Sequence, residues 1–450
     1  MVRGSSIRLV LAATVVFAAP AAPVSGAESA DPADRFARRV AAAMKKAGAF
    51  WRSIATHGGW CGIYSADLKQ RWGEADYHKA TRREIWVQPP GTPTIGRAFL
   101  RAARVTGDAD HLAAARQAGL ALAWGQRTAG GWDYLVRVDH AKPPPAAIVR
   151  KSGRCTFDDN TSQAALTFLM DLDETIDETW CTEAVTLGLK HLLAAQRPNG
   201  AWPQNWPLVG GYHDYHTFND NVINDCIAVC LRAHRQYRQG RYLRAAKRGG
   251  DFIIASAVSA AQPGWAQQYD LKTKPAWGRA FEPPGVCSAA TARNIRTLID
   301  LYRRTADKKY LKPIGPAIRW LRKSQIAKGR WARLYEVGTN KPIYGDRDRK
   351  IHYRLDEISA ERRSGYAWQG SFGVPEAIRA YGRVLLDAKK PKPATAPAAR
   401  PPRVTARQVE SIIDAMDPQG RWVRGRKLHA ADFVRNFSRL TDYLAARPQR

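Results

Sequence analysis

A Gly-x-Trp motif recurs along the chain and most constrains its fold. Its five copies are Gly58–Trp60, Gly130–Trp132, Gly200–Trp202, Gly329–Trp331 and Gly420–Trp422. In three copies a glutamine stands six residues before the tryptophan, at Gln126, Gln196 and Gln325. Glycine lets the chain leave a helix with positive φ, and the tryptophan then packs over the helix end. Repeated units of this kind predict stacked helical hairpins, which form solenoids or α/α toroids.

Helical periodicity fills most of the sequence between these motifs, and regular strand alternation is scarce. Asp31-Pro32 and Thr92-Pro93 are typical helix starts, with proline at the first helical position. Further helices are predicted at 110–126, 161–175, 179–196, 221–239, 242–259, 288–306, 313–327 and 373–387. Residues 388–404 are rich in Pro, Ala and basic residues and are typical of a linker. We therefore expect a catalytic domain at 28–387 and a C-terminal helical segment at 405–450.

The N-terminus is typical of a secretory signal peptide. Arg3 and Arg8 precede an apolar run, and Ser25-Gly26-Ala27 offers small residues for cleavage. We expect residues 1–27 to be removed and the protein to be secreted or periplasmic. Six cysteines are compatible with disulfides after export, but Cys226 and Cys230 are one helical turn apart, so we do not expect them to bridge each other.

The charge balance points to an acidic partner. Lys and Arg number 71 against 40 Asp and Glu, a formal net charge of +31. Nucleic acid, anionic lipid and polyanionic polysaccharide are the candidate partners. Export disfavours nucleic acid, and no segment after the signal is long and apolar enough to span a membrane. The sequence therefore favours a monomer acting on an acidic polysaccharide.

Two similar loops carry the clearest chemistry. Thr156–Thr161 reads TFDDNT and Thr217–Asn221 reads TFNDN, and each precedes a predicted helix. Plain N-capping by Asp, Asn and Thr explains either loop alone. If a toroid brings the two loops together, their carboxylate and amide oxygens suit a hard cation such as Ca2+. Elsewhere, Arg333 and Arg347 are candidates for bidentate carboxylate binding.

Six longer strings closely resemble the motifs of the family 10 pectate lyases. They are IWVQPPGTPTIGRAFLRAARVTGD, GAWPQNWP, HTFNDN, QQYDLKTKPAWGRAFEPP, RWARLYEVGTNKPIYGDRD and ERRSGYAW. The resemblance covers roughly residues 35–387. It implies an all-α fold, an (α/α)3 partial toroid with a central groove. It also implies calcium-assisted β-elimination of polygalacturonate, which releases unsaturated oligogalacturonides.

The resemblance also implies roles for individual residues. Asp220, with Asp158 or Asp159, matches the calcium ligands. Arg279 matches the arginine that acts as the base, while Arg333 and Arg347 match arginines that hold substrate carboxylates. We further expect Asn160, Asn219 and Trp202 to contact substrate, since flat indoles stack on sugar rings. An arginine is normally permanently protonated, so its action as a base requires neighbouring cations and alkaline pH.

Two other functions are compatible with parts of the sequence. An inverting glycoside hydrolase on an α/α toroid needs two carboxyl groups about 6.5–9.5 Å apart. Asp158, Asp159, Asp220 and Glu282 are the candidates for that pair. A non-catalytic binder of acidic polysaccharide needs only the basic groove. Neither alternative accounts for the long motif match.

Overall fold

The structure is a computed structural model that describes residues 31–75, 78–138, 150–387 and 404–447. The predicted signal peptide lies outside these residues, as does the predicted linker except for its last residue. The helices are α1 Pro32–Ser53, α2 Thr92–Thr106, α3 Ala109–Gly125, α4 Thr161–Asp173, α5 Thr179–Ala195, α6 Val222–Tyr237, α7 Gly240–Ala255, α8 Ser288–Thr305, α9 Ile314–Lys323, α10 Ala360–Gly365, α11 Val374–Asp387, α12 Ala406–Asp414 and α13 Ala430–Ala445. No helix of the described part is long and apolar enough to cross a membrane.

Consecutive helices pair into antiparallel hairpins, as the Gly-x-Trp repeat predicts. The pairs are α2–α3, α4–α5, α6–α7 and α8–α9, and the first helix of each pair packs beside the first helix of the next. Local signals set the turns: Gly107 ends α2 with φ of 69°, and the Asp108 carboxylate caps the N-terminus of α3. Most predicted helix limits agree with the structure because these signals are local. The helices predicted to reach 259 and 327 instead end at Ala255 and Lys323, and Gln325–Ala327 forms strand β9 by pairing with β10.

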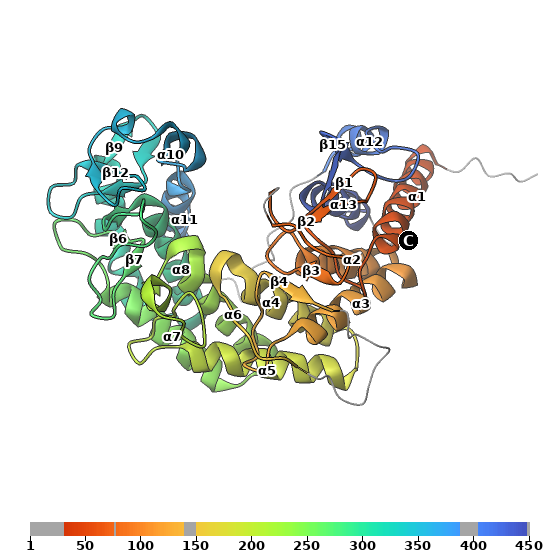
Figure 1. Cartoon of the computed structure of the whole chain (residues 1–450), viewed down its shortest axis with the longest axis horizontal. Helices are drawn as coiled ribbons and strands as arrows, with labels where there is room; N and C mark the ends of the chain where they lie inside the picture. Colours follow the sequence, from red (N-terminus) through yellow and green to blue (C-terminus); the bar gives the residue numbers. More distant parts are fainter. Residues whose placement is uncertain (1–30, 76–77, 139–149, 388–403, 448–450) are drawn as a thin grey trace, which may run out of the picture.

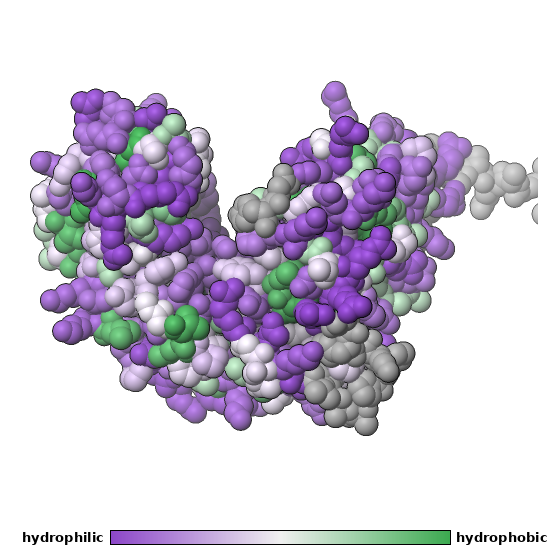
Figure 2. All heavy atoms as spheres, in the orientation of Figure 1, coloured by the Kyte–Doolittle hydropathy of each residue, from purple (hydrophilic) through white to green (hydrophobic). Residues whose placement is uncertain are grey.

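The hairpins curve into an open ring (Figure 1). Helices α2, α4, α6 and α8 form an inner layer, which α13 extends beyond α2 and α11 extends beyond α8. The ring does not close between α11 and α13, and Figure 2 shows the open side as a cleft flanked mainly by hydrophilic residues. The fold is an all-α, (α/α)3 partial toroid with a central groove.

The C-terminal helices complete the N-terminal side of this ring. Helix α13 packs against α1 and α2, and α12 packs against α1. Phe433 stacks on Trp51 with ring centroids 4.5 Å apart, and Phe437 meets Phe99 edge-on at 5.3 Å. Residues from the two ends of the sequence therefore share one hydrophobic core.

Short strands join the loops at the ends of the helices. They are β1 Ile63–Ser65, β2 Arg71–Trp72, β3 Glu84–Trp86, β4 Leu135–Arg137, β5 His216–Thr217, β6 Trp265–Ala266, β7 Gln268–Tyr269, β8 Val286–Cys287, β9 Gln325–Ala327, β10 Arg330–Ala332, β11 Leu334–Tyr335, β12 Pro342–Gly345, β13 Ile351–His352, β14 Gln369–Gly370, β15 Val423–Arg424 and β16 Lys427–His429. One sheet has the order β15-β16-β1-β2, so it also links the two ends of the chain. Another has the order β13-β12-β11-β8-β6 and supports the loops between α7 and α11.

The repeated tryptophans close the ends of the helices. The indole N–H of Trp132 donates to the carbonyl of Leu122, and that of Trp202 donates to Leu192, both at 2.8 Å. The other three copies donate in the same way to Trp51, Leu321 and Ile412. Each bond satisfies a carbonyl that a helix end leaves unpaired. The predicted packing of tryptophan over the helix end is confirmed.

Two of the three glutamines before the motif, Gln126 and Gln196, tie neighbouring hairpins together. Gln126 Nε2 donates to the carbonyls of Gly130 and Ala184, each at 2.9 Å. Gln196 makes the equivalent pair of bonds to its own turn and to α7. A single amide thus fixes a turn and the next outer helix together.

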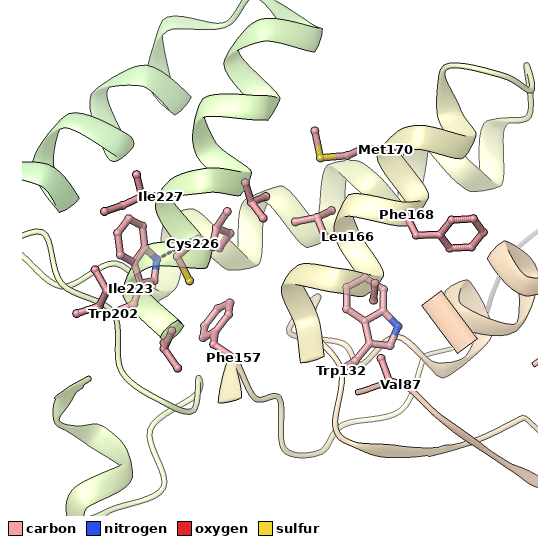
Figure 3. Packing of buried hydrophobic residues seen from close by; sticks show 14 of the residues in the cluster. Val87, Trp132, Phe157, Leu166, Phe168, Met170, Trp202, Ile223, Cys226 and Ile227 are labelled. Atoms are coloured by element: carbon pink, nitrogen blue, oxygen red, sulfur yellow. Dashed lines mark hydrogen bonds between the residues drawn. The ribbon is translucent and has the colours of Figure 1, made fainter. Parts of the chain in front are cut away.

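A continuous hydrophobic core lies between the inner and outer helices. Figure 3 shows Trp132, Phe157 and Trp202 among aliphatic side chains of α4 and α6. All six cysteines are buried and free, so Cys226 and Cys230 do not bridge each other, as predicted.

Candidate active site

Two loops with the same backbone conformation lead into α4 and α6. They contain the single 3-10 turns η1 (Asp158–Asn160) and η3 (Asn219–Asn221). In η1 the two last residues take left-handed φ angles of 48° and 59°, and in η3 they take 45° and 64°. Left-handed backbone costs non-glycine residues about 1–3 kcal/mol each, and Asn and Asp tolerate it best. The same strained turn at two places indicates a functional site rather than an accident of folding.

Local hydrogen bonds hold both loops in this shape. The hydroxyl of Thr156 accepts from the N–H of Asp158 at 3.1 Å, and the hydroxyl of Thr217 accepts from the N–H of Asn219 at 3.0 Å. Asn160 and Asn221 occupy the N-cap positions of α4 and α6, but neither side chain makes a capping bond. Plain N-capping therefore does not explain the side-chain amides of Asn160 and Asn221.

The two loops bring three carboxylates together, because η1 and η3 are in contact. One oxygen from each of Asp158, Asp159 and Asp220 lies within 4.8 Å of the others. The Tyr134 hydroxyl donates to Oδ2 of Asp158 at 2.7 Å, and Asn219 Nδ2 donates to Oδ2 of Asp220 at 2.7 Å. Oδ1 of Asp158 is buried and has no hydrogen-bond partner among the described residues.

Crowding of these carboxylates opposes their ionisation. Desolvation, followed by the charges of Asp220 and Asp158, raises the pKa of Asp159 to about 7. Desolvation and the charge of Asp158 raise the pKa of Asp220, the most exposed of the three, to about 6. Both carboxyls therefore hold protons at a pH where an isolated aspartate is fully ionised. A cation at this position would remove that penalty.

The cluster fits a hard divalent cation. Calcium takes oxygen ligands, mainly carboxylates and carbonyls, whereas zinc sites use nitrogen and sulfur. The unpartnered Oδ1 of Asp158 and the raised pKa values of Asp159 and Asp220 both indicate a cluster that lacks positive charge. The assignment of these three residues as calcium ligands stays a prediction.

Arg279 lies beside the cluster in a bidentate ion pair with Glu282. Its Nε donates to Oε2 at 3.0 Å and its Nη2 donates to Oε1 at 2.6 Å. The Glu282 carboxylate is only 3% exposed, and it also accepts from Gln267 Nε2 and the Tyr366 hydroxyl, both at 2.9 Å. Partial burial acts to lower the pKa of Arg279, but the bonds and charge of Glu282 outweigh it and raise that pKa. In this arrangement Arg279 is a guanidinium cation.

The other two candidate arginines have different surroundings. Arg333 stacks on the rings of Tyr366 and Phe372, with centroid distances of 4.5 and 5.1 Å, and its charge acts on Asp220. The one hydrogen bond of its guanidinium within the described part runs from Nε to the carbonyl of Ala367, so no carboxylate neutralises it. Arg347 lies in an exposed loop, where Glu361 pairs with its guanidinium at 3.1 Å.

Similarity to known proteins identifies the family. The pectic acid lyase family matches residues 126–330 and 327–375, which together make up more than half of the chain. The chain belongs to the pectic acid lyase family. This membership makes it a lyase, and its match includes both aspartate loops as well as Arg279 and Arg333. A comparison with curated proteins found no match.

Two solved structures of a family 10 polysaccharide lyase from Cellvibrio cellulosa have the same fold as this pectic acid lyase. One is a variant in complex with trigalacturonic acid; it is 21% identical with a TM-score of 0.50, and the match covers 65% of this chain and 98% of that one. The other is also 21% identical with a TM-score of 0.50, and covers 64% and 95% of the two chains.

Several residues of the lyase site were not predicted from the sequence. A pocket of about 120 Å³ beside Asp158, Asn219, Arg279 and Glu282 is also lined by side chains from other loops. These are Tyr134, Arg154, Gln204, Asn205, Tyr212 and His213. Only the GAWPQNWP string pointed to any of them, because hydrogen bonds such as that from Tyr134 to Asp158 join residues far apart in sequence.

The structure places three of the predicted substrate contacts, Trp202, Asn219 and Asn160, in different surroundings. Trp202 is 0% exposed, so the prediction that it contacts substrate is wrong. Its indole is committed to the carbonyl of Leu192 and fills the core. Asn219 does line the pocket, whereas Asn160 is half-buried and ends η1 as the N-cap residue of α4. The role of both asparagines in substrate binding stays a prediction.

Proposed function

We propose that this protein is an exported pectate lyase that cleaves polygalacturonate by calcium-assisted β-elimination. The observation that carries the proposal is the cluster of Asp158, Asp159 and Asp220 next to two arginines of different status, one ion-paired and one without a carboxylate partner. The product would be an unsaturated oligogalacturonide. The net charge of +31 would concentrate such a polyanion at the groove.

Elimination in a uronate removes the proton on C5 and expels the glycosidic oxygen at C4. The C5 proton is weakly acidic, and its removal builds negative charge on the adjacent carboxylate. Asp158, Asp159 and Asp220 would hold calcium here, and calcium when bound supplies positive charge against that carboxylate. The chain contributes the fixed oxygen positions that the two strained turns create.

Arg333 would bind and orient a substrate carboxylate. Its guanidinium is held flat by the Tyr366 and Phe372 rings and by the bond from Nε to Ala367. The remaining N–H donors can form a bidentate pair with a carboxylate. Because these contacts restrict the arginine before substrate binds, less side-chain entropy is lost on binding.

Arg279 would act at C5, as the family resemblance implies. In its ion pair with Glu282 the guanidinium has no lone pair to accept a proton, so proton removal by Arg279 requires that it first lose one. Positive charge from bound cations and alkaline pH both favour that loss. As a cation, Arg279 would instead stabilise the charge that develops on the substrate carboxylate.

The geometry disfavours the hydrolase alternative. The three aspartates crowd within 4.8 Å, whereas an inverting pair needs about 6.5–9.5 Å for the attacking water. Glu282, the remaining candidate acid, is buried and engaged by Arg279, Gln267 and Tyr366, so it cannot protonate a leaving group.

The test is the ultraviolet absorbance of polygalacturonate incubated with the protein, with calcium and then with a chelator. Rising absorbance from a C4–C5 double bond, lost on chelation, is expected. Asp220→Ala should abolish the signal while circular dichroism stays native. Asp251→Ala, on the outer helix α7, removes one exposed carboxylate as a matched control and should retain activity. New reducing ends without absorbance would establish a hydrolase, and binding without either would establish a binder.

A further inference from the structure

Most helices of the inner layer carry arginine and no lysine. These are α2, α6, α8, α11 and α13, whereas α4 carries neither, and the outer helices α3, α7 and α9 carry arginines as well. An arginine presents a planar fork that matches a carboxylate, while a lysine is a hydrated point charge. Exposed arginines of the inner layer are therefore candidates to bind carboxylates outside the aspartate loops.

A pocket of about 500 Å³ lies between α6 and α8 on this layer. Its rim carries Arg235, Arg303 and Arg304, whose side chains are exposed. The one acidic side chain in its lining is Asp300, which reaches Arg303 only at 4.0 Å. None of these residues belongs to the pocket beside the aspartate cluster.

The floor of this pocket is polar and incompletely hydrogen-bonded. Asn224 is 3% exposed, and its Nδ2 donates to Asn294 at 2.8 Å and to Thr297 at 2.9 Å. Its Oδ1 has no partner among the described residues. The Nε of Arg232 also has none, although its Nη2 is paired with Asp171. Both atoms are themselves buried, so they make the floor of the pocket polar without being exposed to a ligand.

The distance from the aspartate cluster follows from helix geometry. Asn224 lies in the first turn of α6, four residues after Asp220, and Arg235 lies about 16 Å further along α6 at 1.5 Å per residue. A single uronate therefore cannot occupy both the aspartate cluster and this pocket. Only an oligomer of several sugars is long enough to reach from one to the other.

We propose that the pocket between α6 and α8 is a second binding site for the uronate units of an acidic polysaccharide. The exposed rim arginines bind the carboxylates of the uronate units. This inference rests on the proposed function for the choice of polysaccharide. A second site on the same molecule holds the substrate chain near the cluster and raises its effective concentration there.

Kinetics and binding together test this site. The double variant Arg235→Gln/Arg304→Gln removes two rim charges, and Arg319→Gln/Arg322→Gln on the outer helix α9 removes two charges as the matched control. We expect the rim variant to raise the Kd for decagalacturonate about tenfold, equivalent to about 1.4 kcal/mol. Binding is measured by calorimetry with a chelator present, so that no turnover occurs. The control should change the Kd less than twofold.

The kinetic counterpart is a rise in KM for long polygalacturonate with kcat unchanged, because the pocket does not touch the reacting atoms. Trigalacturonate should show neither change. Equal losses in the two variants would mean a general charge effect and would overturn the proposal. So would an equal loss of affinity for single-stranded DNA of similar charge.

Failure of this inference is distinguishable from failure of the proposed function. Absorbance from the wild-type protein, with no difference between rim and control variants, overturns the second site alone. A rim-specific loss of decagalacturonate affinity in a protein that yields no absorbance supports the second site and overturns the lyase activity.

Discussion

Calcium affinity should fall steeply as the pH drops from 8 to 5. The carboxylates must be ionised to bind a cation, and protons compete for them below their pKa values. With pKa values of about 7 for Asp159 and about 6 for Asp220, both are ionised in about nine-tenths of molecules at pH 8. The fraction is about one in twenty at pH 6 and about one in a thousand at pH 5.

The apparent Kd varies inversely with the fraction of competent molecules. We therefore expect it to rise about twentyfold between pH 8 and 6, and about a thousandfold by pH 5. Two aspartates with ordinary pKa values would leave the Kd almost constant between pH 8 and 6. Since the carboxylates are adjacent, the measured midpoints belong to the cluster rather than to single residues.

Calorimetric titration with calcium at pH 8, 6 and 5 checks this prediction. Asp159→Asn should weaken binding at pH 8 and also reduce the pH dependence, because one titrating ligand is lost. Asp225→Asn is the matched control: burial raises the pKa of Asp225 to about 6, but this residue lies outside the cluster. It should leave the pH dependence intact. An equal wild-type Kd at pH 8 and 6 would show that the crowding argument is wrong.

Three further predictions concern single residues. Glu282→Gln should lower the pKa of Arg279 and move the alkaline rise of kcat to lower pH, whereas a uniformly lower kcat at every pH would show that Arg279 acts only as a cation. Trp202→Phe leaves the buried carbonyl of Leu192 unpaired and should cost about 2 kcal/mol of stability, seen as a lower melting temperature, with an unchanged KM for polygalacturonate. Arg347→Ala should change KM less than threefold, because its guanidinium lies in an exposed loop and is already paired with Glu361; a tenfold rise would place it in the substrate site.

Local sequence signals predicted the helices and one part of the site. Gly107 and Asp108 set a helix end and a helix start by their own conformational preferences. These helix limits can therefore be predicted without knowledge of the fold. The duplicated Thr-Phe before Asp159 and Asp220 likewise indicated two equivalent loops, and the structure shows the same turn at both.

Features that depend on long-range packing could not be predicted from the sequence. The partners of Glu282 include Gln267 and Tyr366, which come from separate loops and meet only in the folded ring. Trp202 was misplaced because an indole beside a turn can point either into a groove or onto its own helix end. The indole packs onto the helix end because its N–H donates to the carbonyl of Leu192. The periodicity of the sequence does not reveal this hydrogen bond.

The joining of the chain ends has a consequence for the order of folding. Arg39 pairs with Glu410 across 371 residues, and Arg447 pairs with Asp34 across 413. Closing a loop of this length costs about 5 kcal/mol of chain entropy, whereas each hairpin closes over a few residues. We therefore expect the hairpins to form early and the packing of α13 against α1 and α2 to form last. Until that step, the face of α2 that carries Phe99 is uncovered, so a chain cut before α12 would carry an exposed hydrophobic surface on one side of its groove.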